Sequence, residues 1–287
     1  MRRIVSLAAS LAALTSLVAC GDDPDAAATV DDRPSAIVSL SPTATEMLFA
    51  IGAGDQIIAV DEYSNHPAAA LEKPNDLSGF EPNVEAIAAL EPDLVVMMDD
   101  RIAAQLEDLG IAVWVGPAAA TFDDVYRQIT ELGAATGRVD EAADLVAQMK
   151  ADIDDAVASA SGSAAGLTYY HELDPTLYSV TSATFAGQVY ALFGLVNIAD
   201  GAQEGNDYPQ LNPEYIVQAD PDLIFLADTK CCGETAASLA ARDGWGDIAA
   251  VTSGGVIELD DDIASRWGPR IVDFVREVAA AVAAAGA

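Results

Sequence analysis

With 287 residues, the chain is long enough for one large or two medium-sized domains, and its hydrophobic fraction of 52% excludes a disordered protein. The formal net charge of −33 at pH 7 argues against nucleic acid and anionic lipid surfaces as partners, because both would repel so acidic a surface. The charge gives little information about a small ligand, since solubility alone accounts for an acidic surface.

The N-terminal region is typical of a targeting segment followed by a tether. Two arginines precede an apolar run over residues 4–18, which is too short to span a membrane comfortably. The run ends in Leu-Val-Ala-Cys, which resembles the lipobox of bacterial lipoproteins, whose cysteine is diacylated. We therefore expect residues 1–19 to be a lipoprotein signal peptide, Cys20 to anchor the protein to the outer face of the cell membrane, and residues 20–35 to be a flexible tether. The alternative is an ordinary signal peptide with an incidental cysteine.

From residue 36 onward, short apolar stretches alternate with helical patterns. Strands are predicted at 37–40, 57–60, 112–115, 167–171, 177–180 and 256–259, and two more begin at Asp93 and Asp222. Helices are predicted at 42–51, 101–109, 123–135, 185–193 and 236–241, with a last helix from Pro269 onward. This alternation predicts an α/β architecture with parallel, doubly wound sheets, whose ligands bind beyond the carboxyl ends of the strands.

Residues 83–97 and 212–226 form an internal repeat, NVEAIAALEPDLVVM and NPEYIVQADPDLIFL. In each copy an asparagine, Asn83 or Asn212, caps a short helix, and a proline ends that helix before a buried strand. Two copies are too few for a solenoid. The repeat therefore predicts equivalent positions in two similar lobes.

The stretch from Val139 to Ala160 joins the predicted lobes. Its apolar residues recur at steps of three and four, which places them on one helix face, and Asp140 is the expected N-cap. A helix of this length spans roughly 33 Å, enough to cross between two domains. We expect an N-terminal lobe at 36–138, a connecting helix at 139–162 and a C-terminal lobe at 163–287.

Motifs for catalysis are missing from the sequence. It has no GxSxG, GxxxxGK[ST] or GxGxxG pattern, and its two histidines, His66 and His171, are too few for a metal site built from several imidazoles. The adjacent Cys231 and Cys232 can form a vicinal disulfide or provide soft metal ligands. One interpretation is therefore a secreted metal-binding or redox protein that uses these cysteines and histidines.

Several motifs together resemble one protein family. They are the opening RPSAIVSLSPTATEMLFAIGAGDQIIAVDEYSNHP, the two N-x-E-x-I-x(4)-P-D-L units, LGAATG before the long helix, and SRWGPRIVDF near the end. The mature chain is similar throughout to the substrate-binding proteins of bacterial ABC importers for iron chelates and cobalamin. The resemblance implies two Rossmann-like lobes with parallel sheets joined by one long α-helix, the class III periplasmic binding protein fold. It also implies a monomer that captures its ligand without catalysis and has no cofactor of its own. The ligand would be a small-molecule chelate containing iron or cobalt, and the partners would be a permease and its ATPase.

The same resemblance gives the repeated glutamates, Glu85 and Glu214, a role in docking. In the cobalamin-binding member of the family, the corresponding residues pair with arginines of the permease. The alternative is that both carboxylates only stabilise helix N-termini, which is worth a few tenths to about 1 kcal/mol. Their matched positions favour docking, since a two-lobed partner must be held at both ends.

The resemblance places the ligand between Tyr63 in the first lobe and the segment 260–267 in the second. Asp262 and Arg266 match an acid and an arginine that contact the ligand in the cobalamin-binding member, although residues four apart on a helix also form ordinary ion pairs. The other expected ligand contacts are the aromatic residues Phe80, Tyr208, Trp245 and Trp267. Tyr169, Tyr170 and Tyr190 are equally candidates for the walls of the site and for the core.

Gly79 and Met98 depart from the family pattern, because the cobalamin-binding member has aromatic residues at both positions. With these departures, the resemblance supports a ferric siderophore or haem at least as well as it supports cobalamin. If the ligand is an iron chelate, Arg266 would offset its negative charge. A further alternative is a binding protein that passes its ligand to a sensor instead of a transporter.

Overall fold

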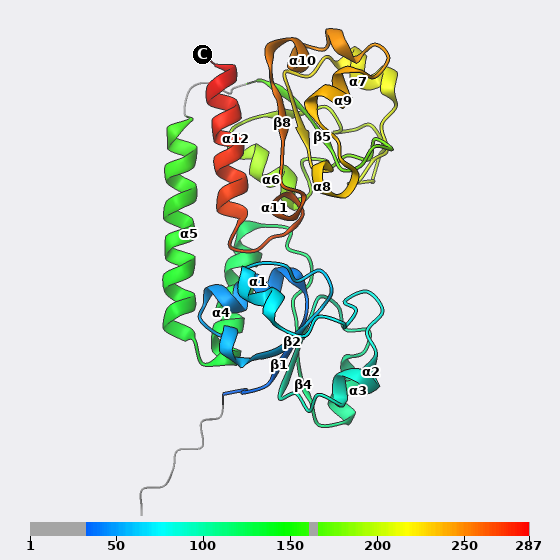
Figure 1. Cartoon of the computed structure of the whole chain (residues 1–287). Helices are drawn as coiled ribbons and strands as arrows, with labels where there is room; N and C mark the ends of the chain where they lie inside the picture. The colour runs from blue at the N-terminus through cyan, green and yellow to red at the C-terminus, as the bar shows by residue number, and fades with distance from the viewer. Residues whose placement is uncertain (1–32, 161–165, 287) are drawn as a thin grey trace, which may run out of the picture. The chain divides into compact units, whose positions relative to one another are not determined.

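The computed structural model describes residues 33–160 and 166–286, so the expected signal peptide, Cys20 and most of the tether lie outside the described residues. The same is true of the last two residues of the predicted connecting segment, 161 and 162. Two four-stranded sheets, ordered β2-β1-β3-β4 and β6-β5-β7-β8, define two lobes (Figure 1). All their strand pairs are parallel, which confirms the predicted architecture.

The first lobe alternates strands and helices along the chain. Its main elements are β1 (Ile37–Leu40), α1 (Pro42–Ala50), β2 (Ile57–Val60), α2 (Val84–Ala88), β3 (Leu94–Met97), α3 (Ala103–Asp108), β4 (Ala112–Val115) and α4 (Phe122–Thr136). The start of α1 is fixed by Ser41, whose side chain accepts a hydrogen bond from the Ala44 N–H, and by a proline at the first helical position.

The second lobe repeats this order. Its main elements are β5 (Thr168–Glu172), α6 (Phe185–Ala191), β6 (Val196–Asn197), α7 (Pro213–Ala219), β7 (Leu223–Leu226), α8 (Thr229–Cys232), α9 (Ala236–Ala240), α10 (Ala249–Ser253), β8 (Val256–Glu258), α11 (Asp261–Ser265) and α12 (Ile271–Ala285). The repeat units are equivalent: α2 leads into β3 and α7 leads into β7, and each of these strands is the third along its lobe's chain and the third in its sheet order. Asn83 and Asn212 cap these helices as predicted.

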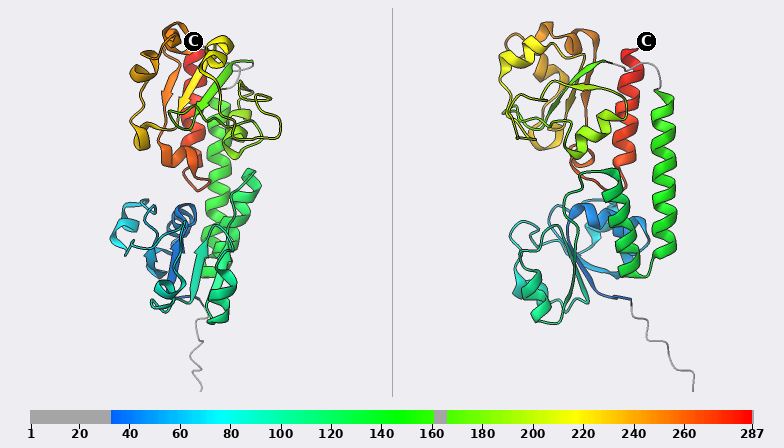
Figure 2. Two further views of the ribbon diagram at one scale, coloured as in Figure 1. Left: turned by 90° about the vertical axis from the view of Figure 1, so that its right-hand side faces the viewer. Right: turned by 180° about the vertical axis from the view of Figure 1, so that it is seen from behind.

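The connecting helix α5 (Val139–Ser159) packs against α4 of the first lobe and α12 of the second (Figures 1 and 2). Its predicted N-cap, Asp140, is wrong, because Arg138 occupies that position. Gly137 ends α4 in a left-handed conformation, with φ 70°, so only Gly137 and Arg138 separate the two helices, and Asp140 already lies in the first turn of α5.

Alternate side chains of the strands point to different cores. In β1, Ile37 faces a core that both lobes share, whereas Val38 faces a core of the first lobe alone. In β7, Phe225 and Leu226 divide in the same way between the shared core and a core of the second lobe. The shared core includes residues of α5, so this helix is a packed structural element and not a flexible linker.

The predicted strand at 177–180 is wrong. Ser179 and Thr181 donate their backbone N–H groups to Pro209 and Asp207, so this segment pairs with a loop and not with the sheet. The place beside β5 is taken by β6, which is too short for a periodic signal in the sequence. None of the helices in residues 33–160 and 166–286 combines the length and apolarity needed to cross a membrane.

Candidate functional site: a cavity between the lobes

A cavity of about 380 Å³ lies between the lobes. Its first-lobe wall includes Asp61 and Met98, which directly follow β2 and β3, and its second-lobe wall follows β8. The cavity therefore lies at the carboxyl ends of both sheets, as expected for ligand sites of this architecture. The expected ligand contacts that line it are Tyr63, Phe80, Asp262, Arg266 and Trp267.

Aromatic rings form part of both walls. Tyr63 and Phe80 pack edge to face with ring centroids 5.5 Å apart, and their side chains stay 51% and 60% exposed. Across the cavity, the indole Nε1 of Trp267 donates a hydrogen bond to Gln128 Oε1 at 3.1 Å, which fixes the ring by a contact with the first lobe. These rings provide apolar surface that can cover the organic part of a large ligand.

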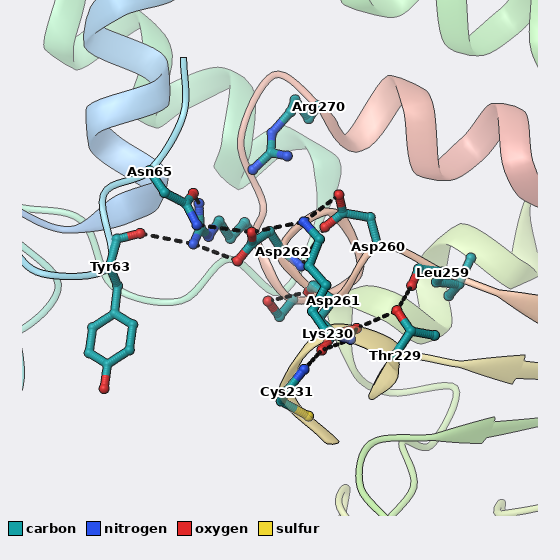
Figure 3. A network of polar contacts seen from close by, with 12 residues as sticks. Tyr63, Asn65, Thr229, Lys230, Cys231, Leu259, Asp260, Asp261, Asp262 and Arg270 are labelled. Carbon is teal, nitrogen blue, oxygen red and sulfur yellow. Dashed lines mark hydrogen bonds and ion pairs between the residues drawn. The ribbon is translucent and has the colours of Figure 1, made fainter. Parts of the chain in front are cut away.

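Arg266 joins the two lobes through its guanidinium group. Its Nη1 donates hydrogen bonds to Glu46 and Asn65, both at 2.9 Å. Its Nη2 donates to the backbone oxygen of Tyr63 at 3.0 Å and to Asp262 at 2.7 Å. The predicted ion pair with Asp262 is thus present, but all four hydrogens on the terminal nitrogens are engaged within the protein. Figure 3 shows Asn65 and the backbone oxygen of Tyr63 directed toward the Asp262 segment, while the Tyr63 ring points away from it.

Glu46 is the buried centre of this contact between the lobes. Its side chain is 2% exposed and also accepts hydrogen bonds from Arg270, whose Nε and Nη2 lie 2.9 Å and 2.5 Å from the two carboxylate oxygens. Two arginines of the second lobe therefore neutralise one glutamate of the first. A buried carboxylate requires such partners, because removing a charge from water is costly.

Asp262 is held on its other side as well. Its Oδ2 accepts hydrogen bonds from Asn65 at 3.0 Å and from Lys230 at 3.2 Å. Burial raises the pKa of Asp262, but the nearby Arg266 cation and these hydrogen bonds outweigh burial and hold the pKa below its usual value. The carboxylate therefore stays charged and paired.

Asp61 has a different environment. Its side chain is fully buried, and its Oδ1 accepts a hydrogen bond from the Tyr63 N–H at 2.7 Å. Burial raises its pKa to about 6, despite the lowering effect of hydrogen bonds from Tyr63 and Ser64. No cation is bonded to Asp61 within residues 33–160 and 166–286. The other acid that lines the cavity, Asp262, forms a salt bridge with Arg266.

The cysteines and histidines lie apart from this cavity lining. Cys231 and Cys232 are joined by a disulfide, so their thiols are not free. His171 is buried beside Tyr190, with its Nδ1 2.7 Å from the Tyr190 hydroxyl, and burial lowers its pKa to about 4. Within the described residues, no group of three or more histidine, cysteine, aspartate or glutamate side chains is arranged to hold a metal ion.

Two expected ligand contacts do not reach the cavity. Trp245 is only 2% exposed and packs in the second-lobe core against Tyr170, with Arg242 over its ring, so its assignment as a ligand contact is corrected. Tyr208 is 55% exposed but lies outside the cavity lining. The tyrosines Tyr169, Tyr170 and Tyr190 are fully buried core residues.

Sequence reasoning missed the residues that hold the lobes together. Glu46 and Arg270 lie within motifs used for the family resemblance, but nothing in their spacing shows that they meet across 224 residues of chain. A signal did exist for Asp61, because an acid directly after a buried apolar strand lies at the ligand-binding edge of a parallel sheet.

Comparison with known proteins gives the family. Residues 37–263 match the family model described as periplasmic binding protein. The chain belongs to the periplasmic binding protein family. A Bacillus subtilis relative, the uncharacterised ABC transporter substrate-binding lipoprotein YvrC, is 31% identical over 88% of this chain and 82% of its own length. A cobalamin-binding protein of Halobacterium salinarum is 30% identical over 90% of this chain and 72% of its own.

A solved structure supports the fold of this periplasmic binding protein. The haem-binding protein RhuT of Roseiflexus sp. RS-1 superposes with a TM-score of 0.76 at 24% identity, over 88% of this chain and 99% of that one. The relatives are substrate-binding proteins of transporters. The protein is therefore an extracytoplasmic solute-binding component of an ABC importer, and not an enzyme.

Proposed function

We propose that the protein captures a metal chelate (a corrinoid, haem or a ferric siderophore) in the cavity between its lobes and delivers it to the permease. The observation that carries this proposal is the cavity at the carboxyl ends of both sheets, between the Tyr63–Phe80 pair and Trp267. Aromatic walls suit a large organic ligand, and relatives are named for cobalamin and haem binding.

A fluorescence titration of the full chain tests the proposal. The chelates are cyanocobalamin, haemin, a ferric hydroxamate and a ferric catecholate, with free ferric ion as a control. We expect saturable quenching at sub-micromolar concentration by one chelate. Because Trp267 lines the cavity whereas Trp245 is buried in a core, Trp267→Phe should remove most of the quenching. Flat titrations with every chelate would contradict the proposal.

Docking on the permease is assigned to Glu85 and Glu214. Both carboxylates are exposed, and each lies in the first turn of the equivalent helix of its lobe, α2 or α7. We expect the double variant Glu85→Lys, Glu214→Lys to lose uptake in cells while keeping its affinity for the chelate. The matched control reverses one exposed glutamate of each lobe, Glu107→Lys with Glu204→Lys, and should transport normally. Loss of chelate affinity in the first variant would contradict this division of roles.

Membrane attachment is assigned to a lipid on Cys20. The sequence before this cysteine resembles a lipobox, and the YvrC relative is named a lipoprotein. Cells expressing the full chain should incorporate labelled palmitate into the protein, and Cys20→Ser should not. Equal labelling of both would exclude Cys20 as the attachment site.

A further inference from the structure

Cys231 and Cys232 form a disulfide between consecutive residues at the end of α8. The bridge closes a ring within two adjacent residues and joins no separate segments of the chain. Because the stabilisation from a disulfide grows with the length of the loop that it closes, this bridge contributes little to the stability of the fold. Neither cysteine lines the cavity between the lobes, so the proposed function leaves the bridge unexplained as well.

The disulfide is accessible to a reactant in solution. Both cysteines are exposed, and so is Gly233, the residue that follows them. Gly233 ends α8 in a left-handed conformation, and a Cβ atom on it would meet no other atom within 4 Å. Disulfide exchange requires a thiolate to approach one sulfur atom, so an exposed bridge beside open space meets the geometric requirement for this reaction.

The same turn of helix is attached to the segment that leads into the cavity wall. The backbone N–H groups of Lys230 and Cys231 donate hydrogen bonds to the Asp261 carboxylate, at 3.0 and 2.7 Å. The hydroxyl of Thr229 donates to the backbone oxygen of Leu259 at 2.7 Å. A helix of only four residues is not stable without such contacts, so the conformation of α8 depends on Asp261 at one end and on the disulfide at the other.

Lys230 connects α8 to the contact between the lobes. Its Nζ lies 2.6 Å from Asp260 Oδ2 and 3.2 Å from Asp262 Oδ2. The same oxygen of Asp262 accepts a hydrogen bond from Asn65 of the first lobe, at 3.0 Å. Figure 3 shows this series of contacts, which runs from Cys231 to Asn65. A change in the backbone at the disulfide therefore reaches the contact between the lobes through two intervening side chains.

We propose that Cys231–Cys232 is a thiol–disulfide exchange site, whose reduction by a dithiol loosens α8 and, through Lys230, the contact of Asp262 with the first lobe. A thiolate of the dithiol attacks one cysteine sulfur, and the bond between the cysteines breaks as a mixed disulfide forms. The second thiol of the reductant then displaces the protein sulfur and closes a disulfide of its own. Two electrons and two protons have then passed to the protein, which carries two thiols.

A dithiol is the fitting class of reductant because of where the first released thiol lies. That thiol is one residue away from the mixed disulfide and closes the original bridge again unless a second thiol of the reductant reacts sooner. Reduction gives the backbone of both cysteines more conformations, so the N–H of Cys231 and the side chain of Lys230 should leave their carboxylate partners more often. The inference does not depend on which chelate the cavity binds.

The test counts thiols and measures amide hydrogen exchange in the full chain, before and after dithiothreitol treatment without denaturant. The sequence has three cysteines, so protein without a lipid on Cys20 should show one reactive thiol when oxidised and three when reduced. Exchange in residues 229–233 should become at least about fivefold faster on reduction, and exchange in residues 262–266 should also rise. The double variant Cys231→Ser, Cys232→Ser should match the reduced wild type and should not respond to dithiothreitol.

Lys230→Met tests the path to the lobe contact. Reduction of this variant should still speed exchange in residues 229–233 but should leave residues 262–266 unchanged, because the link to Asp262 is missing. The matched control Lys150→Met removes an exposed lysine of α5 and should respond to reduction as the wild type does.

Three results would overturn the proposal. The first is that dithiothreitol releases no further thiols until urea unfolds the protein, and the second is that it releases them without changing exchange in residues 229–233. The third is equal acceleration of residues 262–266 in the wild type and in Lys230→Met. Should a variant fail to fold, the oxidised and reduced wild type decide by the first two results. The proposed function is tested separately, since none of these measurements involves chelate binding.

Discussion

Each lobe buries two carboxylates beside its sheet: Glu46 and Asp61 in the first lobe, Glu172 and Asp228 in the second. In both lobes the glutamate is hydrogen-bonded to arginine, whereas the aspartate accepts no hydrogen bond from an arginine among the described residues. Burial raises the pKa of Asp61 to about 6, and burial together with the nearby Glu172 raises that of Asp228 to about 7.

The lobes differ in where the arginine comes from. Arg242 belongs to the same lobe as Glu172, which it binds with both terminal nitrogens. Glu46 is bound by Arg266 and Arg270, which belong to the other lobe. Neutralising Glu46 therefore requires the lobes to be in contact, whereas neutralising Glu172 does not. The comparison indicates that the second-lobe cluster stabilises one lobe and the first-lobe cluster controls how the lobes associate.

The largest expected effect comes from Arg242→Met. It leaves Glu172 buried without its cation, so the free energy of unfolding in urea should fall by about 3 to 5 kcal/mol. Chelate affinity of the folded protein should not change, because the cluster lies outside the cavity lining. The control Arg127→Met removes an exposed arginine and should cost less than about 1 kcal/mol. A change in chelate affinity would contradict the claim that the Arg242–Glu172 cluster stabilises only the second lobe.

Glu46→Gln tests the contact between lobes. It removes the charge that Arg266 and Arg270 share, and we expect the free energy of unfolding to fall by about 3 kcal/mol. Unlike Arg242→Met, it should also increase the radius of gyration measured by X-ray scattering, since the lobes lose their common carboxylate. Glu107→Gln, at an exposed position of the first lobe, should change neither quantity. An unchanged radius for Glu46→Gln would contradict its role between the lobes.

Asp61→Asn should stabilise the ligand-free protein. The folded pKa of about 6 exceeds the ordinary value of 3.8, so charging Asp61 costs stability as pH rises from about 4 to above 6. At pH 8 the variant should therefore be more stable by about 3 kcal/mol, and at pH 4 by less than about 1 kcal/mol. Denaturation at both pH values measures this. Destabilisation at pH 8 would show that the charged form is needed for folding.

The smallest effects test what the lobes have in common. Asn83→Ala and Asn212→Ala each remove the N-cap of the equivalent helix, α2 or α7, and each should cost about 1 kcal/mol in thermal or urea unfolding. Similar losses would support the equivalence of the two repeat units. A loss at one position and none at the other would argue against it.

Local signals explain what the sequence could predict. Proline, the asparagine caps and the buried apolar runs correctly predicted the repeat units, and the three-four spacing predicted α5. Segments stabilised by distant partners were harder. The 177–180 segment has strand composition, but its hydrogen bonds go to a loop near residue 209.

The candidate site was predictable only in part. The family motifs pointed to Tyr63, Phe80 and the 262–267 segment, which the fold does bring together. Composition could not show that Trp245 lies in a core, because a tryptophan suits a ligand pocket equally well. Pattern alone could not show that Arg266 is already bound by Glu46, since that contact depends on the two lobes meeting.

A crystal structure of the full-length protein with bound cyanocobalamin is the most direct test. We predict the corrinoid between the Tyr63–Phe80 pair and Trp267, with Arg266 still bound to Glu46. A corrinoid outside this cavity, or one held by an Arg266 that has left Glu46, would contradict the account.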